Sequence, residues 1–189
     1  MHEPRRVLLF SGHMIDAPDR TEPRFPADKE PLAAAAIAGV LERLEPGPQD
    51  LGICGGACGG DLLFAEAALA RGARLEIRIP FAEETFLQES VDFAGARWRQ
   101  RYFAVTRHPQ ATLHLAPVEL GPLAEGADPY ERNNLWMLES ALRFGAEKVD
   151  FICLWNGQGG DGPGGTQHLM NEVRQRSGRV HWLDTRRLW

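Results

Sequence analysis

The sequence predicts an α/β fold, namely a three-layer Rossmann-like sandwich with a mainly parallel sheet of about six strands. Short apolar runs alternate with longer stretches of helical periodicity, which is the pattern of strand–helix units that build a parallel sheet. Residues 7–10 are continuously apolar, as strands buried on both faces are, and residues 149–155 are strongly apolar. The 189 residues show no internal repeat and no boundary, so we expect one domain over 1–189.

Each predicted strand is a short apolar run that ends at glycine, proline or a polar cluster. The predicted strands are residues 7–10, 51–54, 75–79, 112–115, 149–155 and 179–183. Sheets of this type place the first strand near the centre, and we expect it beside the second and fourth strands, with right-handed crossovers. Ligands bind such sheets at the carboxyl ends of the strands.

Helical periodicity fills the segments between the strands. The predicted helices are residues 32–44, 62–70, a segment with Leu87, Val91, Ala94, Trp98 and Tyr102 at helical spacing, 128–145 and 166–176. Asp128, Pro129 and Glu131 form a strong helix start, because Asp caps, Pro suits the first helical position and Glu completes a capping box. Two long loops remain, at 116–127 and 15–31. The second of these runs through Pro18 to Pro31, and loops of this length usually serve as a lid or bind a ligand.

Composition excludes several classes of protein. The chain has 21 basic and 26 acidic residues and a net charge of −5, which argues against binding nucleic acid through bulk charge. No apolar run approaches the roughly 18 residues that span a bilayer. Three cysteines (Cys54, Cys58 and Cys153) lack zinc-ligand spacing and are interpreted as buried thiols in a reducing cytoplasm. We therefore expect a cytoplasmic protein with no metal and no cofactor.

Three strand ends carry unusual residues. Ser11, Gly12 and His13 follow the first strand, and two glycine-rich turns at 55–60 and 157–165 follow the second and fifth strands. Such turns let the backbone approach a ligand and aim helix N–H groups at an anion. The alternative is that the glycines only permit tight turns. Neither turn is a P-loop or a dinucleotide fingerprint, because the required lysine and acidic residue are absent.

Several single residues near these turns have two interpretations each. Asp61 caps its helix or accepts hydrogen bonds from ligand hydroxyls, and His13 binds a ligand or packs in a loop. Arg132 lies in the first turn of a helix, where a cation opposes the dipole, so it pairs with a phosphate or carboxylate or is simply solvated. Asn133 and Asn134 share that turn and are candidates for contacting a ligand.

Tryptophans close to these turns also have two interpretations. Trp155 and Trp136 stack on a base or belong to the core. The full set of candidate binding residues is Ser11, Gly12, His13, Gly55, Gly56, Ala57, Gly59, Gly60, Asp61, Arg132, Asn133, Asn156, Gly162, Gly164, Gly165 and Thr166.

Three motifs together make the chain similar to a known superfamily. SGHMID after the first strand, GGACGGDLLFAEAALARGA after the second and GDGPGGT before the last predicted helix resemble the LOG-like nucleotide-binding superfamily, also called SLOG. That group includes the LOG phosphoribohydrolases and the DNA-processing protein A fold. The resemblance covers essentially the whole chain. It implies a Rossmann-like domain that binds a nucleotide or nucleotide derivative as a sensor, and relatives often self-associate, for which Leu188 and Trp189 are candidates.

The resemblance to the LOG enzymes themselves is looser. Their P-G-G-x-G-T signature is followed by paired glutamates that take part in cleaving an N-glycosidic bond. Here Asp161 and Gly162 precede Gly165-Thr166, and His168-Leu169 stand where the glutamates would be. The phosphate-binding backbone is kept, whereas the carboxylate is missing or displaced. A binding module is thus the favoured hypothesis.

The alternative is an enzyme that hydrolyses the N-glycosidic bond of a nucleotide or transfers the nucleoside. Its carboxylate would have to be Asp61, Asp161, Glu172 or Glu66. NAD-type redox chemistry and a purely structural role are the remaining, less favoured possibilities.

Overall fold

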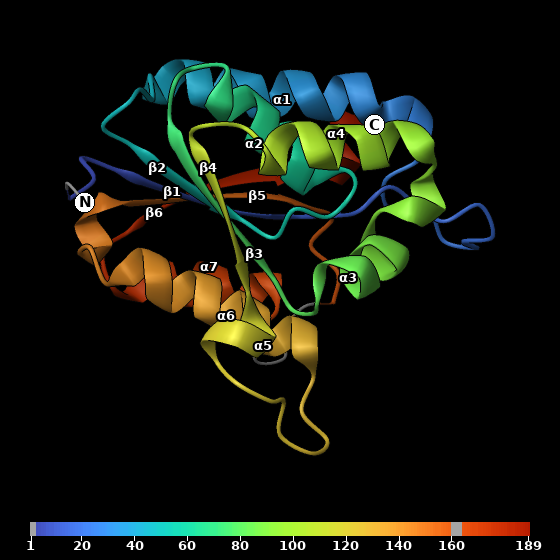
Figure 1. Cartoon of the computed structure of the whole chain (residues 1–189). Helices are drawn as coiled ribbons and strands as arrows, with labels where there is room; N and C mark the ends of the chain where they lie inside the picture. Colours follow the sequence, from blue (N-terminus) through green and yellow to red (C-terminus); the bar gives the residue numbers. More distant parts are fainter. Residues whose placement is uncertain (1–2, 160–163) are drawn as a thin grey trace.

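The computed structural model describes residues 3–159 and 164–189, which form a parallel sheet between two layers of helices (Figure 1). The strands are β1 (Val7–Gly12), β2 (Leu51–Cys54), β3 (Arg74–Ile79), β4 (Ala111–Leu115), β5 (Val149–Trp155) and β6 (Arg179–Asp184). All pairs are parallel, and the order is β4-β3-β2-β1-β5-β6. The predicted α/β class with a Rossmann-like sheet is confirmed.

The expected neighbours of β1 are partly wrong. β1 pairs with β2 and β5, whereas β4 lies at the edge beyond β3. The chain steps in one direction from β1 to β4 and reverses only on entering β5. The point at which the strand order reverses therefore lies between β1 and β5, and both strands direct their carboxyl ends to the same edge of the sheet.

Helices cover both faces of the sheet (Figure 1). One layer contains α1 (Glu30–Leu44), α2 (Gly60–Leu69) and α4 (Ala96–Thr106), and the other contains α6 (Pro129–Leu142) and α7 (Thr166–Gln175). Alternate residues of β1 enter the two cores: Leu8 and Phe10 pack toward α1 and α2, while Val7 and Leu9 pack toward α6 and α7. Phe10 stacks on Phe64 of α2 with ring centroids 4.9 Å apart. This alternation places Ser11 on the α6–α7 face.

The predicted helix through Leu87 and Tyr102 is divided into two. α3 (Glu83–Ser90) and the 3-10 helix η2 (Asp92–Ala94) precede Gly95, whose φ of 103° ends the helical path, and α4 starts directly after it. A left-handed φ is open to glycine at no steric cost, so the periodicity continues while the helix axis does not. The short elements that remain are η1 (Ala27–Lys29), α5 (Ala116–Glu119), η3 (Ala146–Lys148) and α8 (Thr185–Leu188).

The proline-rich segment 15–26 is fixed to the body of the protein. Asp16 Oδ2 accepts hydrogen bonds from the backbone N–H groups of Arg24 and Phe25, at 2.9 and 2.8 Å. The Phe25 ring is fully buried and stacks on Trp189, with centroids 5.3 Å apart. Trp189, which was a candidate for self-association, thus packs within its own chain. The segment forms part of the carboxyl edge, on the right in Figure 1.

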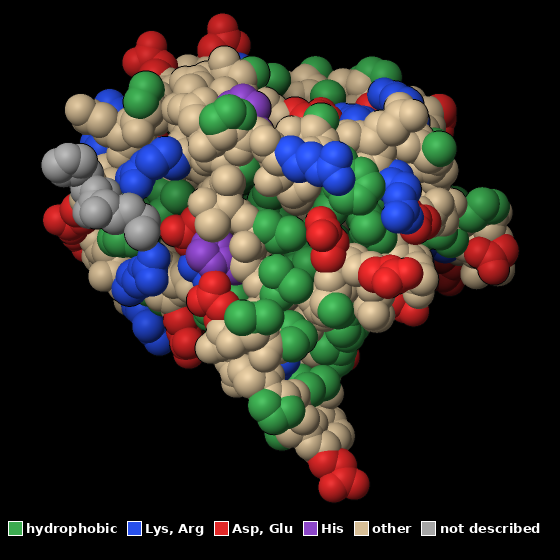
Figure 2. Space-filling model, in the orientation of Figure 1, with side chains coloured by type: hydrophobic (Ala, Val, Ile, Leu, Met, Phe, Trp, Pro, Cys, Tyr) green, Lys and Arg blue, Asp and Glu red, His purple; other side chains and the backbone are tan. Residues whose placement is uncertain are grey.

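Residues 116–128 project from the molecule. The predicted helix start after this segment is confirmed, because Asp128 Oδ1 accepts the Glu131 N–H at 2.7 Å. Hydrophobic side chains continue from the body onto the projection (Figure 2), and Val118 on it is 78% exposed. Lys, Arg, Asp and Glu are otherwise interspersed over this face. Within residues 3–159 and 164–189, no helix combines the length and apolarity needed to cross a membrane.

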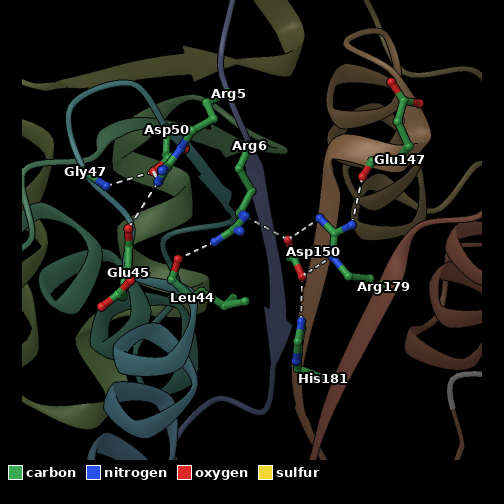
Figure 3. A network of polar contacts seen from close by, with 10 residues as sticks. All are labelled: Arg5, Arg6, Leu44, Glu45, Gly47, Asp50, Glu147, Asp150, Arg179 and His181. Atoms are coloured by element: carbon green, nitrogen blue, oxygen red, sulfur yellow. Dashed lines mark hydrogen bonds and ion pairs between the residues drawn. The ribbon is translucent and has the colours of Figure 1, made fainter.

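The amino edge of the sheet is held by two buried carboxylates (Figure 3). Asp50 binds Arg5 through both oxygens, at 3.0 and 2.7 Å. Asp150 binds Arg179 through both oxygens, at 2.9 and 2.7 Å, and its Oδ1 lies 2.7 Å from His181 Nε2. These contacts connect β1, β5 and β6 at the edge opposite to the glycine-rich turns.

The three cysteines are free and buried, as the sequence predicts. Burial raises the pKa of Cys58 and of Cys153 to about 12 and raises that of Cys54 as well. Thiols with such high pKa values are poor nucleophiles at neutral pH.

Candidate functional site

His13 joins the ends of three strands at the carboxyl edge. Its backbone N–H donates to Leu154 O at 2.9 Å, and its carbonyl accepts the Gly60 N–H at 3.1 Å. Its side-chain Nε2 accepts the Asn156 N–H at 3.1 Å. The turn after β2 and the turn after β5 therefore flank the end of β1 on the same edge, as the binding hypothesis requires.

The protonation state of His13 follows from these contacts. The residue is 9% exposed, and burial, with a smaller effect from the Arg24 charge, lowers its pKa to about 4. The imidazole is therefore neutral at neutral pH. Because Nε2 accepts a hydrogen bond, we assign the proton to Nδ1, which has no partner among the described residues. His13 thus offers one N–H donor at the centre of the edge.

Glycines of the first turn have a packing role. A Cβ on Gly59 would lie 2.7 Å from Ile15 N and 2.9 Å from His13 O, and its φ is 98°. A Cβ on Gly60 would lie 3.1 Å from the Phe10 ring, and one on Gly12 would lie 2.8 Å from that ring. The glycines let the end of β1 pass against the turn, which is the tight-packing alternative.

The backbone of this turn is already partly bonded. The Ala57 N–H donates to Asp61 Oδ2 at 3.2 Å, and the Cys58 N–H donates to Ser90 O at 2.9 Å. The Gly60 N–H donates to the His13 carbonyl, as described above. The turn therefore presents fewer N–H groups to an external anion than the sequence predicts.

Asp61 does not cap α2, so that interpretation is wrong. Gly59 occupies the N-cap position, and Asp61, in the first turn, directs its carboxyl group back into the loop. Oδ2 would lie 2.8 Å from a Cβ on Gly55, so the carboxyl group fills the concave side of the turn. Burial raises the pKa of Asp61 to about 7, although the hydrogen bond from Ala57 acts in the opposite direction. A large fraction of the carboxyl group is thus protonated at neutral pH.

The first turn of α6 approaches the edge from the other layer. Asn133 is 3% exposed and donates through Nδ2 to Arg78 O at 2.8 Å, while its Oδ1 is buried without a partner in the part of the chain described. Asn134 Nδ2 donates to Gly164 O at 3.0 Å. Asn133 therefore carries an acceptor that none of the described residues satisfies.

Arg132 is directed elsewhere. Its Nη1 donates to the carbonyls of Gly121 and Pro122, at 3.1 and 3.2 Å. The guanidinium holds the projecting segment against α6 and is not brought to His13. Arg132 thus has a structural role in place of the anion-pairing role that the sequence suggests.

The second turn is described in part. Asn156 Oδ1 accepts the Gln158 N–H at 3.0 Å, and Gly157 has a φ of 75°. Gly165 is the N-cap of α7 and Thr166 is its first residue, and no side chain of the described residues caps this helix. Gly55 and Gly56 lie opposite, in the first turn. The candidates Asp161 and Gly162 lie outside the described residues.

Two candidate carboxylates are engaged in ion pairs away from His13. Glu66 binds Arg101 within the α2–α4 layer, at 2.6 and 2.7 Å. Glu172 binds Arg176 one turn further along α7, at 2.7 Å. Of the described carboxylates proposed from the sequence, Asp61 alone lies at the glycine-rich turns.

The tryptophans belong to packed clusters. Trp155 is 5% exposed and donates through Nε1 to Gln158 O at 3.1 Å. Trp136 supports the Arg78 guanidinium, 4.4 Å from the ring centroid. The core interpretation is therefore confirmed for Trp155, whereas the Trp136 ring forms a cation–π contact with Arg78.

Sequence reasoning missed two arginines of the proline-rich segment. Arg20 Nε lies 3.3 Å from Asp16 Oδ1 and donates to Glu22 O at 2.9 Å. Arg24 is half-buried, and its Nε is buried without a partner among the described residues. Both charges act on His13. The sequence feature that could have identified these arginines is their position in a long loop directly after the polar end of β1.

Comparison with models of protein families finds no match, and neither does comparison with curated protein sequences. Among solved structures, the chain is similar to DNA processing protein A (DprA) from Streptococcus pneumoniae. The TM-score is 0.47 and the sequence identity is 13%, over 95% of this chain and 50% of that protein. The chain thus spans about half the length of that protein.

Proposed function

We propose that this chain binds a nucleotide or nucleotide derivative, as a sensor-type domain, at the carboxyl ends of β1, β2 and β5. The observation that carries the proposal is the convergence of the two glycine-rich turns on His13. This lies where the strand order reverses between β1 and β5, and open α/β sheets bind their ligands at such a point. The LOG-like motifs occur in the same segments, and they favour the same ligand class.

The polar groups at this edge suit a nucleotide. His13 Nδ1–H is a donor at the end of β1, and Asn133 Oδ1, beside the end of β3, is an acceptor without a described partner, and bases and sugars carry groups that pair with either kind. Ser11 adds a hydroxyl on the α6–α7 face. No described side chain caps the first turn of α7, and uncapped N–H groups favour a phosphate. The free thiols are consistent with the proposed cytoplasmic location.

A ligand panel tests the proposal. Thermal unfolding and calorimetry with nucleosides, nucleoside mono- and diphosphates and dinucleotides are expected to identify at least one stabilising ligand. A ligand at 100 times its Kd adds about 2.7 kcal/mol to the free energy of unfolding. A panel without any shift refutes nucleotide binding.

A pair of serine variants then locates the site. Ser11→Ala is expected to weaken binding by about 0.5–1.5 kcal/mol, the usual net contribution of one hydrogen bond. Ser177→Ala, after the carboxyl-terminal end of α7 at the opposite edge, serves as the control and leaves affinity unchanged. Equal affinities in the two variants place the ligand elsewhere.

A second candidate function is hydrolysis or transfer at the N-glycosidic bond of a nucleotide. It is favoured by the Asp61 carboxyl, whose pKa of about 7 suits a general acid at neutral pH. Incubation with nucleoside monophosphates, followed by chromatography for free base, tests it. Release by the native protein that is lost in Asp61→Asn supports the enzyme. Binding without release leaves the sensor function.

A further inference from the structure

We propose that Arg24, from the proline-rich segment, contacts the phosphate group of the bound nucleotide. This inference rests on the proposed function and adds to it a specific charged residue and the ligand group that it takes. Arg132, the arginine that the sequence favours for this role, is bonded to the projecting segment.

The backbone fixes Arg24 beside the end of β1. The Arg24 N–H donates to Asp16 Oδ2, and the Asp16 N–H donates to Phe25 O at 2.9 Å. Asp16 follows His13 by three residues, and the Ile15 N–H between them donates to Cys58 O of the first glycine-rich turn. The segment that carries Arg24 is thus attached directly to the candidate site.

Within residues 3–159 and 164–189, no carboxylate forms an ion pair with the Arg24 guanidinium, although the Asp16 charge acts on it. The neighbouring carboxylate, Asp16, is occupied: Oδ2 accepts two backbone N–H groups, and Oδ1 faces Arg20. Arg24 Nε is buried and unpartnered in the described chain. Burial and the Arg20 charge lower the pKa of Arg24 more than the Asp16 charge raises it, so Asp16 compensates this half-buried cation only in part.

His13 does not supply that counter-charge. It is neutral, and the Arg24 charge acts on the ring, whose Nδ1–H is a second donor. An arginine fork beside an N–H donor matches an oxyanion with several acceptor oxygens, which a phosphate provides. A carboxylate shares part of this chemistry, and the experiment separates the two.

The experiment compares ligands that differ only in the anion. Calorimetry measures the affinity of the full chain for the best nucleotide from the panel, for its parent nucleoside and for the nucleoside 5′-carboxylate. The same titrations are made with Arg24→Gln and with Arg107→Gln. Arg107 is an exposed arginine over the Phe103 ring at the end of α4, before β4, and therefore on the amino edge. Unfolding curves of both variants test that the fold is kept, which is expected because the Arg24 side chain makes no hydrogen bond to the described residues.

We expect the native chain to prefer the phosphate over the nucleoside, and Arg24→Gln to lose roughly 10- to 150-fold in phosphate affinity. Nucleoside affinity stays the same in that variant, and Arg107→Gln behaves like the native chain. An undiminished phosphate preference in Arg24→Gln overturns this inference while nucleotide binding stands. Tighter binding of the 5′-carboxylate than of the phosphate overturns the assignment to phosphate. Failure of the native chain to bind any of these ligands overturns the proposed function, and this inference with it.

Discussion

Asp150→Asn is expected to remove a stabilising contribution that disappears in acid. The carboxyl group of Asp150 is fully buried and faces Arg6, Arg179 and His181 (Figure 3). Burial alone would raise the pKa of Asp150, but hydrogen bonds from His181 and Arg179, and their charges, outweigh it and lower the pKa from 3.8 to about 2. A folded-state pKa below the unfolded value means that the native state favours the ionised form.

The magnitude follows from that difference. At about 1.4 kcal/mol per pH unit, a pKa lowered from 3.8 to about 2 corresponds to roughly 2.4 kcal/mol. Arg179 is 49% exposed, so solvent screening reduces the expected contribution to about 1–2 kcal/mol. The stabilisation is fully present above pH 4 and is lost as the pH falls toward 2.

Urea unfolding between pH 2 and pH 6 measures this contribution. The difference in unfolding free energy between the native chain and Asp150→Asn is expected to be largest near pH 6. It should narrow by about 1–2 kcal/mol between pH 4 and pH 2. Asp19→Asn removes an exposed carboxylate without a described partner and serves as the control. A difference that is independent of pH would refute the role of the ionised carboxylate.

Three further predictions concern the carboxyl edge. Phe25→Ala should lower the free energy of unfolding by about 3–5 kcal/mol, because a fully buried ring is lost from its stack on Trp189; an unchanged urea midpoint contradicts this. Gly59→Ala should cost about 1–3 kcal/mol, because its φ of 98° and the 2.7 Å approach to Ile15 N leave no room for a Cβ; a neutral effect on thermal unfolding is the contrary outcome. The His13 ring should titrate by NMR with a midpoint near pH 4. The free energy of unfolding should fall as the pH drops from 6.5 toward 4, because the unfolded chain then binds a proton that the folded chain does not. An NMR midpoint near pH 6.5 argues against the buried neutral ring.

The sequence predicts the strands well because their signal is local. The central strands are mostly apolar segments bounded by turn residues, and the predicted strands at 51–54 and 149–155 coincide with β2 and β5. Strand order has no such local signal, because the position of β4 at the edge of the sheet depends on where the connecting helices cross the sheet. The break between α3 and α4 is also hidden, because apolar spacing continues across Val91 and Gly95, whose φ angles of −135° and 103° interrupt the helix.

The candidate site is predictable in position but not in its contacts. Parallel strands bring their carboxyl ends to one edge, so the meeting of the two glycine-rich turns follows from topology. The sequence does not show that Asp61 occupies its own turn or that Arg132 holds the projecting segment. Arg24 was missed because its position depends on Asp16 and Phe25, which are brought together only by folding.

The two carboxylate clusters at the amino edge lie apart from the groups that are proposed to bind a ligand. Asp50 and Asp150 anchor the sheet at one end, whereas the polar groups proposed for binding lie at the other. Residues at the carboxyl edge can therefore change with little cost to the anchoring contacts. Substitutions at Ser11 and Arg24, which are proposed to bind the ligand, leave the Asp50 and Asp150 contacts at the opposite edge unchanged, which suits the chain to directed evolution of the proposed site.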